Sequence, residues 1–384
     1  MKKILLVHTS YQNLGGEDVA VENEITLLKN HFEVETLIFS NNVQNYFSQF
    51  IYFIFNKNFK SMRMLQEKIS TFKPDVVYVH NTWFKGSVGL FKILEKNNQK
   101  TVIKLHNFRY FCTKSFLSKN HLGNEIYCGA CGMEKDKVGF FNKYFSDSYF
   151  KSFLVIIYGK RYFKILQNLN LDLVVLTKFH KEFLTNLGIS KNRIFILPNF
   201  INTKILKQPN ETPSLVYAGR ISKEKGVEKL IKSFLQSKLS NWKLKIIGEG
   251  PLLLELKNNY KSYKNIQFFG ALRNEEVLKT IANSNAVATA TLLYEGQPTL
   301  LCEASLIGVA SIFPQSGGIN EFFPNDYELS FDFKIDSELT AKLNTLMDEH
   351  FIDDIAIKNQ NFINDYLDYD RLLDIFKDVF YDQK

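Results

Sequence analysis

The stretch AVATATLLYEGQPTLLCEA, residues 286–304, joins a short apolar run to a second one through a loop that contains glycine and proline. Residues 286–293 are almost free of charge, which predicts a β-strand covered on both faces. Pro298 suits the first position of a helix, where a missing N–H costs nothing. We therefore expect Glu295 in the loop at the carboxyl end of the strand and Glu303 one to two turns into the helix. In an open α/β sheet, such a loop faces the ligand crevice.

Similar short apolar runs alternate with helix-length segments along the whole chain, which is typical of parallel sheets built from βαβ units. In order, they are ILLVHT, VETLIF, VVYVH, TVIKLH, LVVLT, IFILP, LVYAG, LKIIG, IQFFG, AVATATLL and VASIF. The pattern predicts an α/β protein of two doubly wound, Rossmann-like domains. We place these domains at residues 1–200 and 215–363, with a linker at 201–214 and a C-terminal helix at 364–384 that packs back on the first domain.

The composition supports a packed globular protein. The chain has 384 residues, of which 45% are hydrophobic and 23% charged, so two domain cores are expected. No run approaches the roughly 18 apolar residues that span a bilayer. The N-terminal MKKILLVH has an apolar core of only four residues, which fits a first strand better than a signal peptide and predicts a cytoplasmic protein. The net charge is +8, but no nucleic-acid motif accompanies it, so we expect no nucleic-acid partner.

Two segments, 43–62 and 138–166, are crowded with aromatic residues and carry lysines. They can be core helices whose lysines extend to solvent. They can equally form an interfacial surface that holds the protein at the inner face of a cell membrane, with cations on anionic lipid.

Glycine and basic residues mark two further strand ends. Gly15 and Gly16 follow the first strand and would let a ligand approach the backbone, although a plain turn explains them as well. The G-x-G-x-x-G fingerprint is absent, which disfavours NAD. Arg220 and Lys225 lie between a strand and a helix, where two cations suit a diphosphate; the alternative is a solvated charged face.

The motifs YAGRISKEKGVEKLI, IIGEGP, LYEGQPTLLCEA and SGGINE occur in this order, after GGEDVAVENE, KPDVVYVHNTW, KLHNFRYFC and ILPNFIN. Together they resemble the retaining glycosyltransferases of family 4, in particular those of bacterial surface-polysaccharide synthesis. The resemblance covers nearly the whole chain. It implies the GT-B fold, in which two Rossmann-like domains face each other across a crevice.

The resemblance also assigns roles. Glu295 would contact the donor sugar and Glu303 the ribose hydroxyls, while Arg220 and Lys225 would stabilise the leaving diphosphate without a catalytic metal. It implies no cofactor and a UDP- or GDP-sugar as donor. The full set of predicted donor-binding residues is Gly15, Gly16, Gly219, Arg220, Lys225, Gly296, Gln297, Pro298, Thr299, Leu300 and Glu303.

His106, in KLHNF, matches the family's active-site histidine near the donor sugar. The chain departs from the family pattern at three positions. Asn107 replaces an aspartate that often follows this histidine, and Gln297 stands where a bulky apolar residue is common. Ala310 replaces the usual proline, a change that looks structural.

The cysteines allow two interpretations. Cys128 and Cys131 have metal-ligand spacing, and Cys112 with His121 could complete a structural zinc site. The alternative is a set of reduced thiols. Cys302 is expected to be a small buried hydrophobe.

The sequence thus predicts a retaining, metal-independent hexosyltransferase that acts on a glycan or lipid-linked acceptor. Two alternatives stay open: a sugar-nucleotide epimerase of the same fold, and a non-catalytic subunit that binds nucleotide sugars.

Overall fold

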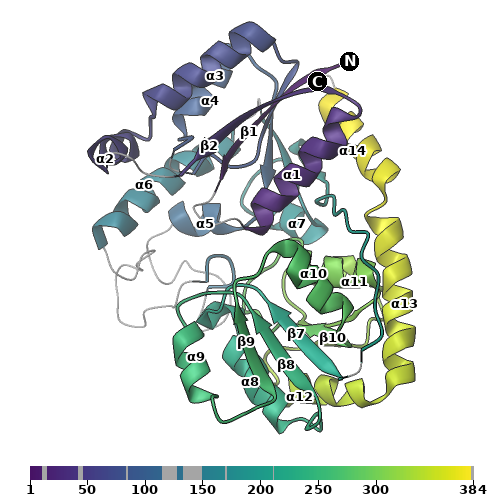
Figure 1. Ribbon diagram of the computed structural model, residues 1–384. Helices are drawn as coiled ribbons and strands as arrows, with labels where there is room; N and C mark the ends of the chain where they lie inside the picture. Colours follow the sequence, from purple (N-terminus) through teal and green to yellow (C-terminus); the bar gives the residue numbers. More distant parts are fainter. Residues whose placement is uncertain are drawn as a thin grey trace. The chain divides into compact units, whose positions relative to one another are not determined.

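The computed structural model describes residues 1–10, 15–41, 46–83, 85–114, 128–132, 149–168, 171–210 and 212–381. They form two compact units, one of Met1–Phe200 with Tyr369–Lys384 and one of Ile201–Asp368. Figure 1 shows that each unit contains a sheet with helices on both faces. Within the described ranges, no helix combines the length and the apolar character that crossing a bilayer requires.

The first unit is built on a parallel sheet in the order β2-β1-β3-β4-β5-β6. Its strands are β1 (Lys3–Ser10), β2 (Glu33–Ser40), β3 (Val76–Val79), β4 (Thr101–Leu105), β5 (Leu171–Val175) and β6 (Ile194–Ile196). Its helices are α1 (Gly16–Lys29), α2 (Tyr46–Phe55), α3 (Phe59–Phe72), α4 (Gly89–Lys96), α5 (Arg109–Lys114), α6 (Tyr149–Leu166), α7 (Lys178–Asn186) and α14 (Tyr369–Tyr381), with the short η2 (Lys191–Arg193).

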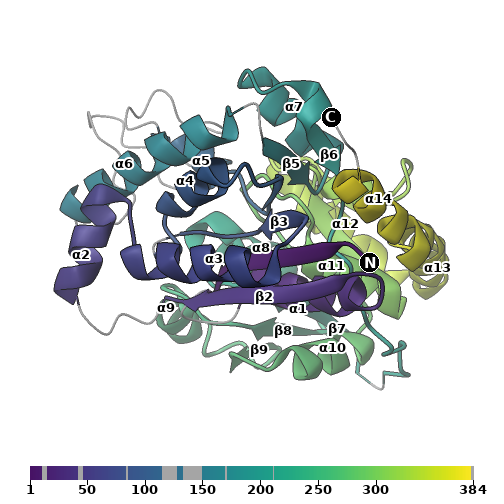
Figure 2. The same cartoon turned by 90° about the horizontal axis from the view of Figure 1, so that it is seen from above.

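The strands of this unit are apolar on both sides because helices cover both faces of the sheet. Leu5 and Val7 pack with residues of α3, α4 and α6, whereas Ile4 and Leu6 pack with residues of α1 and α14. The period of two along a strand produces this division. Figure 2 shows the same sheet from above, with α2 beside α6.

The second unit has a parallel sheet in the order β12-β11-β10-β7-β8-β9. Its strands are β7 (Ser214–Ala218), β8 (Lys243–Ile247), β9 (Ile266–Gly270), β10 (Ala286–Ala288), β11 (Ala310–Pro314) and β12 (Ser330–Phe331). Its helices are α8 (Val227–Gln236), α9 (Leu253–Asn259), α10 (Asn274–Ala282), α11 (Thr299–Ile307), α12 (Asp336–Asn344) and α13 (Glu349–Tyr366), with the short η3 (Lys223–Lys225), η4 (Ile319–Phe322) and η5 (Thr345–Met347).

Each sheet has a point where the order of strands reverses. In the first unit the chain runs from β1 to β2 and then returns to the other side of β1 as β3. In the second unit it runs outward from β7 to β9 and then returns beside β7 as β10. The loops after the two strands at such a point diverge, which leaves room for a ligand between them. The candidate residues therefore belong at the carboxyl ends of β1 and β3 and of β7 and β10.

The observed boundaries differ from the predicted ones in two places. The supposed linker, 201–214, packs on the second unit: Lys207 donates a backbone hydrogen bond to Ile307 (3.0 Å), and Gln208 donates one to Ala282 (2.8 Å). The chain returns to the first unit at Tyr369 rather than at residue 364, because α13 continues to Tyr366.

Residues 286–304 also fold differently from the prediction in two details. Strand β10 ends at Ala288, five residues before the predicted end at 293, and the remaining residues belong to the loop. Pro298 is the N-cap of α11, so the helix begins one residue later than expected. The consequence is a longer loop between β10 and α11.

Candidate active site

At the reversal point of the second unit, the loops after β7 and β10 interlock. Gly226 has φ +67°, and a β-carbon there would lie 1.9 Å from the carbonyl oxygen of Ala290. The backbone N–H of Leu292 donates to the carbonyl of Glu224 at 2.9 Å. Only glycine permits both the left-handed backbone and this close approach. The register of the two loops is therefore fixed at Gly226.

This register brings Lys225 and Glu295 together. The Nζ atom of Lys225 lies 2.5 Å from Oε1 of Glu295, and both side chains are about one quarter exposed, at 27% and 23%. The hydroxyl of Thr291 donates to the same carboxylate oxygen at 3.1 Å. Arg220, also predicted for the diphosphate, is exposed, and its carbonyl accepts a hydrogen bond from the Tyr217 hydroxyl at 2.8 Å.

The glycine pair in SGGINE holds the backbone of Glu295. Gly318 donates its N–H to the carbonyl of Glu295 at 2.8 Å, and Glu295 forms an isolated β-bridge with Gly317. Gly317 has φ +64°, and a β-carbon there would lie 2.7 Å from the Glu295 backbone nitrogen. The motif therefore positions Glu295 instead of offering an independent ligand loop.

Glu303 lies in a drier environment than Glu295. It is 7% exposed, and burial raises the pKa of its carboxyl to about 7, against a hydrogen bond from Asn274 that lowers it. Nearby on the same loop and helix, Gln297 is buried and makes a hydrogen bond with the buried Cys302 thiol. A carboxyl that titrates near neutrality can either donate or accept a hydrogen bond, so ligand hydroxyls can decide its charge.

The remaining predicted residues of this unit lie along the same strand ends. Thr299 and Leu300 open α11, where backbone N–H groups have no partner within the helix. Gly219 follows β7 directly, and Gly296 is buried between Glu295 and Gln297. A helix N-terminus beside a lysine is suited to an anion.

Gly15 and Gly16 were grouped with these residues in the prediction, but they belong to the first unit. Gly16 begins α1, and the N–H of Gly15 donates to Oδ2 of Asp18 at 2.9 Å. The other oxygen of Asp18 lies 2.9 Å from Nε2 of His8 at the end of β1. The Gly15 N–H is thus engaged within the protein, which weakens its assignment as a ligand donor.

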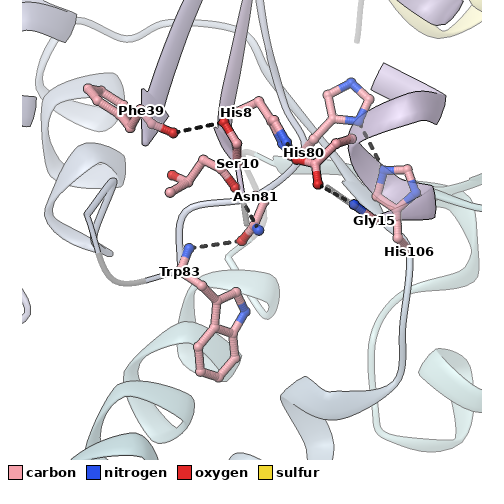
Figure 3. Close-up of polar contacts among 10 residues, drawn as sticks. His8, Ser10, Gly15, Phe39, His80, Asn81, Trp83 and His106 are labelled. Carbon is pink, nitrogen blue, oxygen red and sulfur yellow. Dashed lines mark hydrogen bonds and ion pairs between the residues drawn. The ribbon is translucent and has the colours of Figure 1, made fainter. Parts of the chain in front are cut away.

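His106 follows β4 and contacts a second histidine that the sequence analysis did not select. Nδ1 of His80 lies 3.0 Å from Nε2 of His106, and the rings stack with centroids 5.3 Å apart, as Figure 3 shows. Burial, followed by the positive charge of Lys104, holds the pKa of His106 well below its usual value. Burial and the neighbouring His106 do the same to the pKa of His80. Both rings are therefore neutral near pH 7.

A buried ion pair supports the two histidines. Lys104, near the carboxyl end of β4, pairs with Glu24 of α1, and both side chains are fully buried. Glu24 also accepts a hydrogen bond from the hydroxyl of Tyr78 at 3.1 Å and lies 3.6 Å from Nε2 of His80. Burial raises the pKa of Glu24 and lowers that of Lys104, so desolvation outweighs the mutual attraction for each group.

This arrangement favours one tautomer of His106. The Glu24 carboxylate faces Nε2 of His80, which favours a proton there and leaves Nδ1 of His80 as an acceptor. Nε2–H of His106 then donates to it. Nδ1 of His106 keeps its lone pair and has no hydrogen-bond partner among the described residues. Like Nε2 of His80, this ring nitrogen is buried.

Asn81 joins the loop after β3 to the end of β1. Its amide nitrogen donates to the carbonyl of Thr9 at 3.0 Å, and its oxygen accepts the backbone N–H of Trp83 at 2.9 Å (Figure 3). A partial signal was present in the sequence, because His8 and Lys104 lie within apolar runs and His80 directly follows one.

The comparisons with known proteins agree with this architecture. Residues 200–364 match the family model described as "Glycosyl transferases group 1". The chain is 24% identical over 367 residues to amylovoran biosynthesis glycosyltransferase AmsD of Erwinia amylovora, covering 90% of each protein. It is 22% identical over 149 residues to a phosphatidylinositol N-acetylglucosaminyltransferase subunit of Arabidopsis thaliana, covering 36% of this chain and 33% of that protein.

Solved structures show the fold. Sucrose-phosphate synthase of Thermosynechococcus elongatus superposes with a TM-score of 0.74 at 14% identity, over 99% of this chain and 98% of that one. HepE of Anabaena, solved with UDP and glucose, gives a TM-score of 0.68 at 14% identity over 99% and 100%. The protein has the GT-B fold. The predicted GT-B fold is thereby confirmed.

The burial of the Lys104–Glu24 ion pair leads to a prediction about protein stability. Lys104→Met or Glu24→Gln should each destabilise the protein by about 3–5 kcal/mol, since one buried charge or polar group loses its partner. The double variant should cost much less than the sum of the two single ones. Denaturant unfolding of the four proteins measures this coupling.

The partly exposed pair of Lys68 and Glu35, 2.6 Å apart in the same unit, is the matched control. Lys68→Met should cost less than about 1 kcal/mol. Additive costs for Glu24 and Lys104 would contradict the interpretation that they act as one buried unit.

Proposed function

We propose that the protein is a retaining glycosyltransferase that moves a sugar from a nucleotide diphosphate to a glycan or lipid-linked acceptor in bacterial polysaccharide synthesis. The observation that carries the proposal is the contact of Lys225 with Glu295 at the reversal point of the second unit, just before the N-terminus of α11. Two similar proteins support it: the Erwinia relative is named for amylovoran biosynthesis, and HepE was solved with UDP and glucose.

In this proposal the second unit holds the donor. Arg220, Lys225 and the N–H groups that open α11 bind the diphosphate, because cations and N–H groups without a partner in the helix attract an anion. Glu303 accepts hydrogen bonds from the ribose hydroxyls, and Glu295 holds the sugar. Cations at the leaving group stabilise the negative charge that grows on it, so no catalytic divalent metal is required.

The reaction that fits these groups is a same-face substitution. The acceptor hydroxyl oxygen bonds to the anomeric carbon while the bond from that carbon to the diphosphate oxygen breaks. The hydroxyl proton passes to the departing phosphate oxygen, which gives a glycoside of unchanged anomeric configuration and a free nucleoside diphosphate. The assignment of His106 to the donor sugar, which the resemblance implies, stays a prediction.

A screen of UDP- and GDP-sugars against lipid-linked acceptors tests the reaction. We expect acceptor-dependent release of nucleoside diphosphate, an axial or equatorial linkage that matches the donor, and full activity in EDTA without Mg²⁺ or Mn²⁺. An epimer formed from donor alone would identify the epimerase instead. Donor binding without turnover by any acceptor would favour the non-catalytic subunit, and activity restored by Mg²⁺ or Mn²⁺ would refute the metal-free mechanism.

Substitutions of Glu303 and Glu295 should change different kinetic constants. Glu303→Gln should weaken donor binding, since ribose contacts exist in both the ground state and the transition state. Losing charged hydrogen bonds costs about 1.5–3 kcal/mol, which raises KM roughly 10- to 150-fold. Glu295→Gln should lower kcat instead. It should bind free diphosphate at least as tightly as the wild type, because it removes the anion 2.5 Å from Lys225. Calorimetry with the nucleoside diphosphate measures both affinities.

The raised pKa of Glu303 allows a second test of its proposed role in ribose binding. Its carboxyl is ionised only above about pH 7, so the affinity of the wild type should rise relative to Glu303→Gln as pH increases through that value. The ratio of the two proteins cancels the titration of the diphosphate itself. Equal loss of nucleotide affinity in both glutamate variants would show that the division of roles is wrong.

We also propose that the first unit contacts an anionic membrane surface. Six aromatic side chains of α2, α3 and α6 are at least one third exposed, and we call them the aromatic face: Phe50, Phe55, Phe59, Tyr149, Phe150 and Phe153. The rings of Phe50 and Phe150 lie 5.6 Å apart, which joins α2 to α6. Exposed aromatics in this number exceed what a core helix leaves at its surface, which favours the interfacial alternative.

An apolar groove adjoins this face. It has a volume of about 540 Å³ and lies between the end of α2, α4 and α6, with Phe55, Phe91 and Ile165 among its lining residues. Lys57, Lys92, Arg161 and Lys164 also line it, against one acid, Glu95. Apolar walls with an excess of positive charge are complementary to an anionic lipid, whose chain enters the groove while its head meets the cations.

Vesicle sedimentation tests the membrane proposal. The protein should pellet with anionic vesicles at low salt, dissociate as salt increases, and remain in solution with zwitterionic vesicles. Reversing the charges of Lys160, Arg161 and Lys164, all exposed, should weaken binding without reducing turnover of a soluble acceptor.

The matched control reverses three exposed lysines of the second unit, Lys257, Lys261 and Lys264, which changes the net charge equally. This control variant should still sediment with anionic vesicles at low salt. No binding by the wild type, or equal loss in both triple variants, would leave the aromatic face without a membrane role.

A further inference from the structure

Three of the four cysteines of this chain converge in the first unit. Cys112 lies on α5, while Cys128 and Cys131 lie in the short described stretch 128–132. Their sulfur atoms are all within 4.8 Å of one another, and those of Cys112 and Cys128 are 3.3 Å apart. Cys112 and Cys128 are buried, and Cys131 is partly exposed.

The geometry matches the requirements of a thiolate metal centre. Zinc binds thiolate sulfur at about 2.3 Å in a tetrahedral arrangement, which places ligand sulfurs roughly 3.8 Å apart. One separation is 3.3 Å and none exceeds 4.8 Å, a range that includes this value, so one ion can reach all three atoms. The C-x-x-C segment forms a turn that holds Cys128 close to Cys131. Gly132 has φ +75°, and its N–H donates to the carbonyl of Cys128 at 2.8 Å.

Neither a disulfide nor ordinary core packing accounts for the whole cluster of three sulfurs. A disulfide would join two of them and leave the third thiol beside it. Core packing explains a buried cysteine singly, as for Cys302 in the second unit, but gives no reason for three sulfurs to gather from positions up to 19 residues apart.

We propose that Cys112, Cys128 and Cys131 bind one zinc ion with a structural role. Three thiolates occupy three of the four tetrahedral positions. Among the described residues no further histidine, cysteine or acid joins the group. His121, which the sequence analysis suggested as the fourth ligand, lies outside the described residues, and the fourth ligand is left unassigned.

The ion would secure the segment that follows His106. Helix α5 begins three residues after His106, and its Tyr110 hydroxyl lies 2.7 Å from Nε2 of His180 on α7. Zinc at Cys112 adds a second attachment, from the same helix to the segment around Cys128. Because binding requires deprotonated thiols in the folded arrangement, its free energy contributes directly to folding.

Metal analysis of the reduced, purified protein tests the proposal without any substrate. We expect about one zinc per chain, displaced by a mercurial thiol reagent. Cys112→Ser, Cys128→Ser and Cys131→Ser should each lose most of the metal, whereas Cys302→Ser should keep it. Removing zinc from the wild type should lower Tm, and zinc, but neither Mg²⁺ nor Mn²⁺, should restore it.

Cobalt substitution keeps the test decisive if a serine variant does not fold. The wild type loaded with Co²⁺ should show thiolate-to-metal charge transfer of the intensity expected for three sulfurs, with the visible bands of a tetrahedral site. A folded wild type that takes up neither metal would overturn the proposal. So would a Cys112–Cys128 disulfide in the mass spectrum of the purified protein, or full zinc content in the three serine variants. None of these results depends on glycosyl transfer.

Discussion

Parallel strands end at one edge of a sheet, and this constraint determines where chemistry can occur in each unit. Where the order of strands reverses, two loops diverge from neighbouring strands, so a ligand can meet residues that are distant in sequence. In the second unit this edge joins Lys225, after β7, to Glu295, after β10. In the first unit the same carboxyl edge brings together His80, after β3, and His106, after β4, one strand beyond the reversal between β1 and β3. In the second unit the two loops diverge only after they touch at Gly226 and Ala290, and this close approach brings Lys225 to Glu295.

The first unit retains a buried charge pair at this edge, although burial is unfavourable for both partners. A sheet covered by helices on both faces offers no water to Lys104 or Glu24, and each group is left with the other and with a few hydrogen bonds. The buried ion pair orients the histidine rings. Glu24 lies on α1, Lys104 on β4 and His80 after β3, so the pair ties three elements to the ring that contacts His106. A hydrophobic pair of the same volume would pack as well but would give the histidines no preferred tautomer.

Much of this could be predicted from the sequence, because alternating apolar runs and turn residues act locally. The strand series and the position of Glu295 in a loop follow from such patterns. The length of β10 could not be predicted, since the uncharged run continues to residue 293 although the strand ends at Ala288. The partner of His106 was also missed, because His80 and Glu24 reach it only through tertiary structure. The burial of Glu303 depends on α10 packing against α11, which no local pattern specifies.

The pairing of Lys225 with Glu295 bears on how the proposed donor would be held. A lysine ammonium has three N–H donors, and the carboxylate engages one of them at 2.5 Å. Two donors remain for phosphate oxygens, so the diphosphate can bind Lys225 without displacing Glu295. The lysine would then link the leaving group to the carboxylate that holds the sugar. As negative charge grows on the departing phosphate, attraction to Lys225 increases, while Glu295 stays fixed by its backbone contacts with Gly317 and Gly318. A rigid carboxylate and a lysine that serves both groups would keep sugar and leaving group in one geometry through the reaction, as a same-face transfer requires.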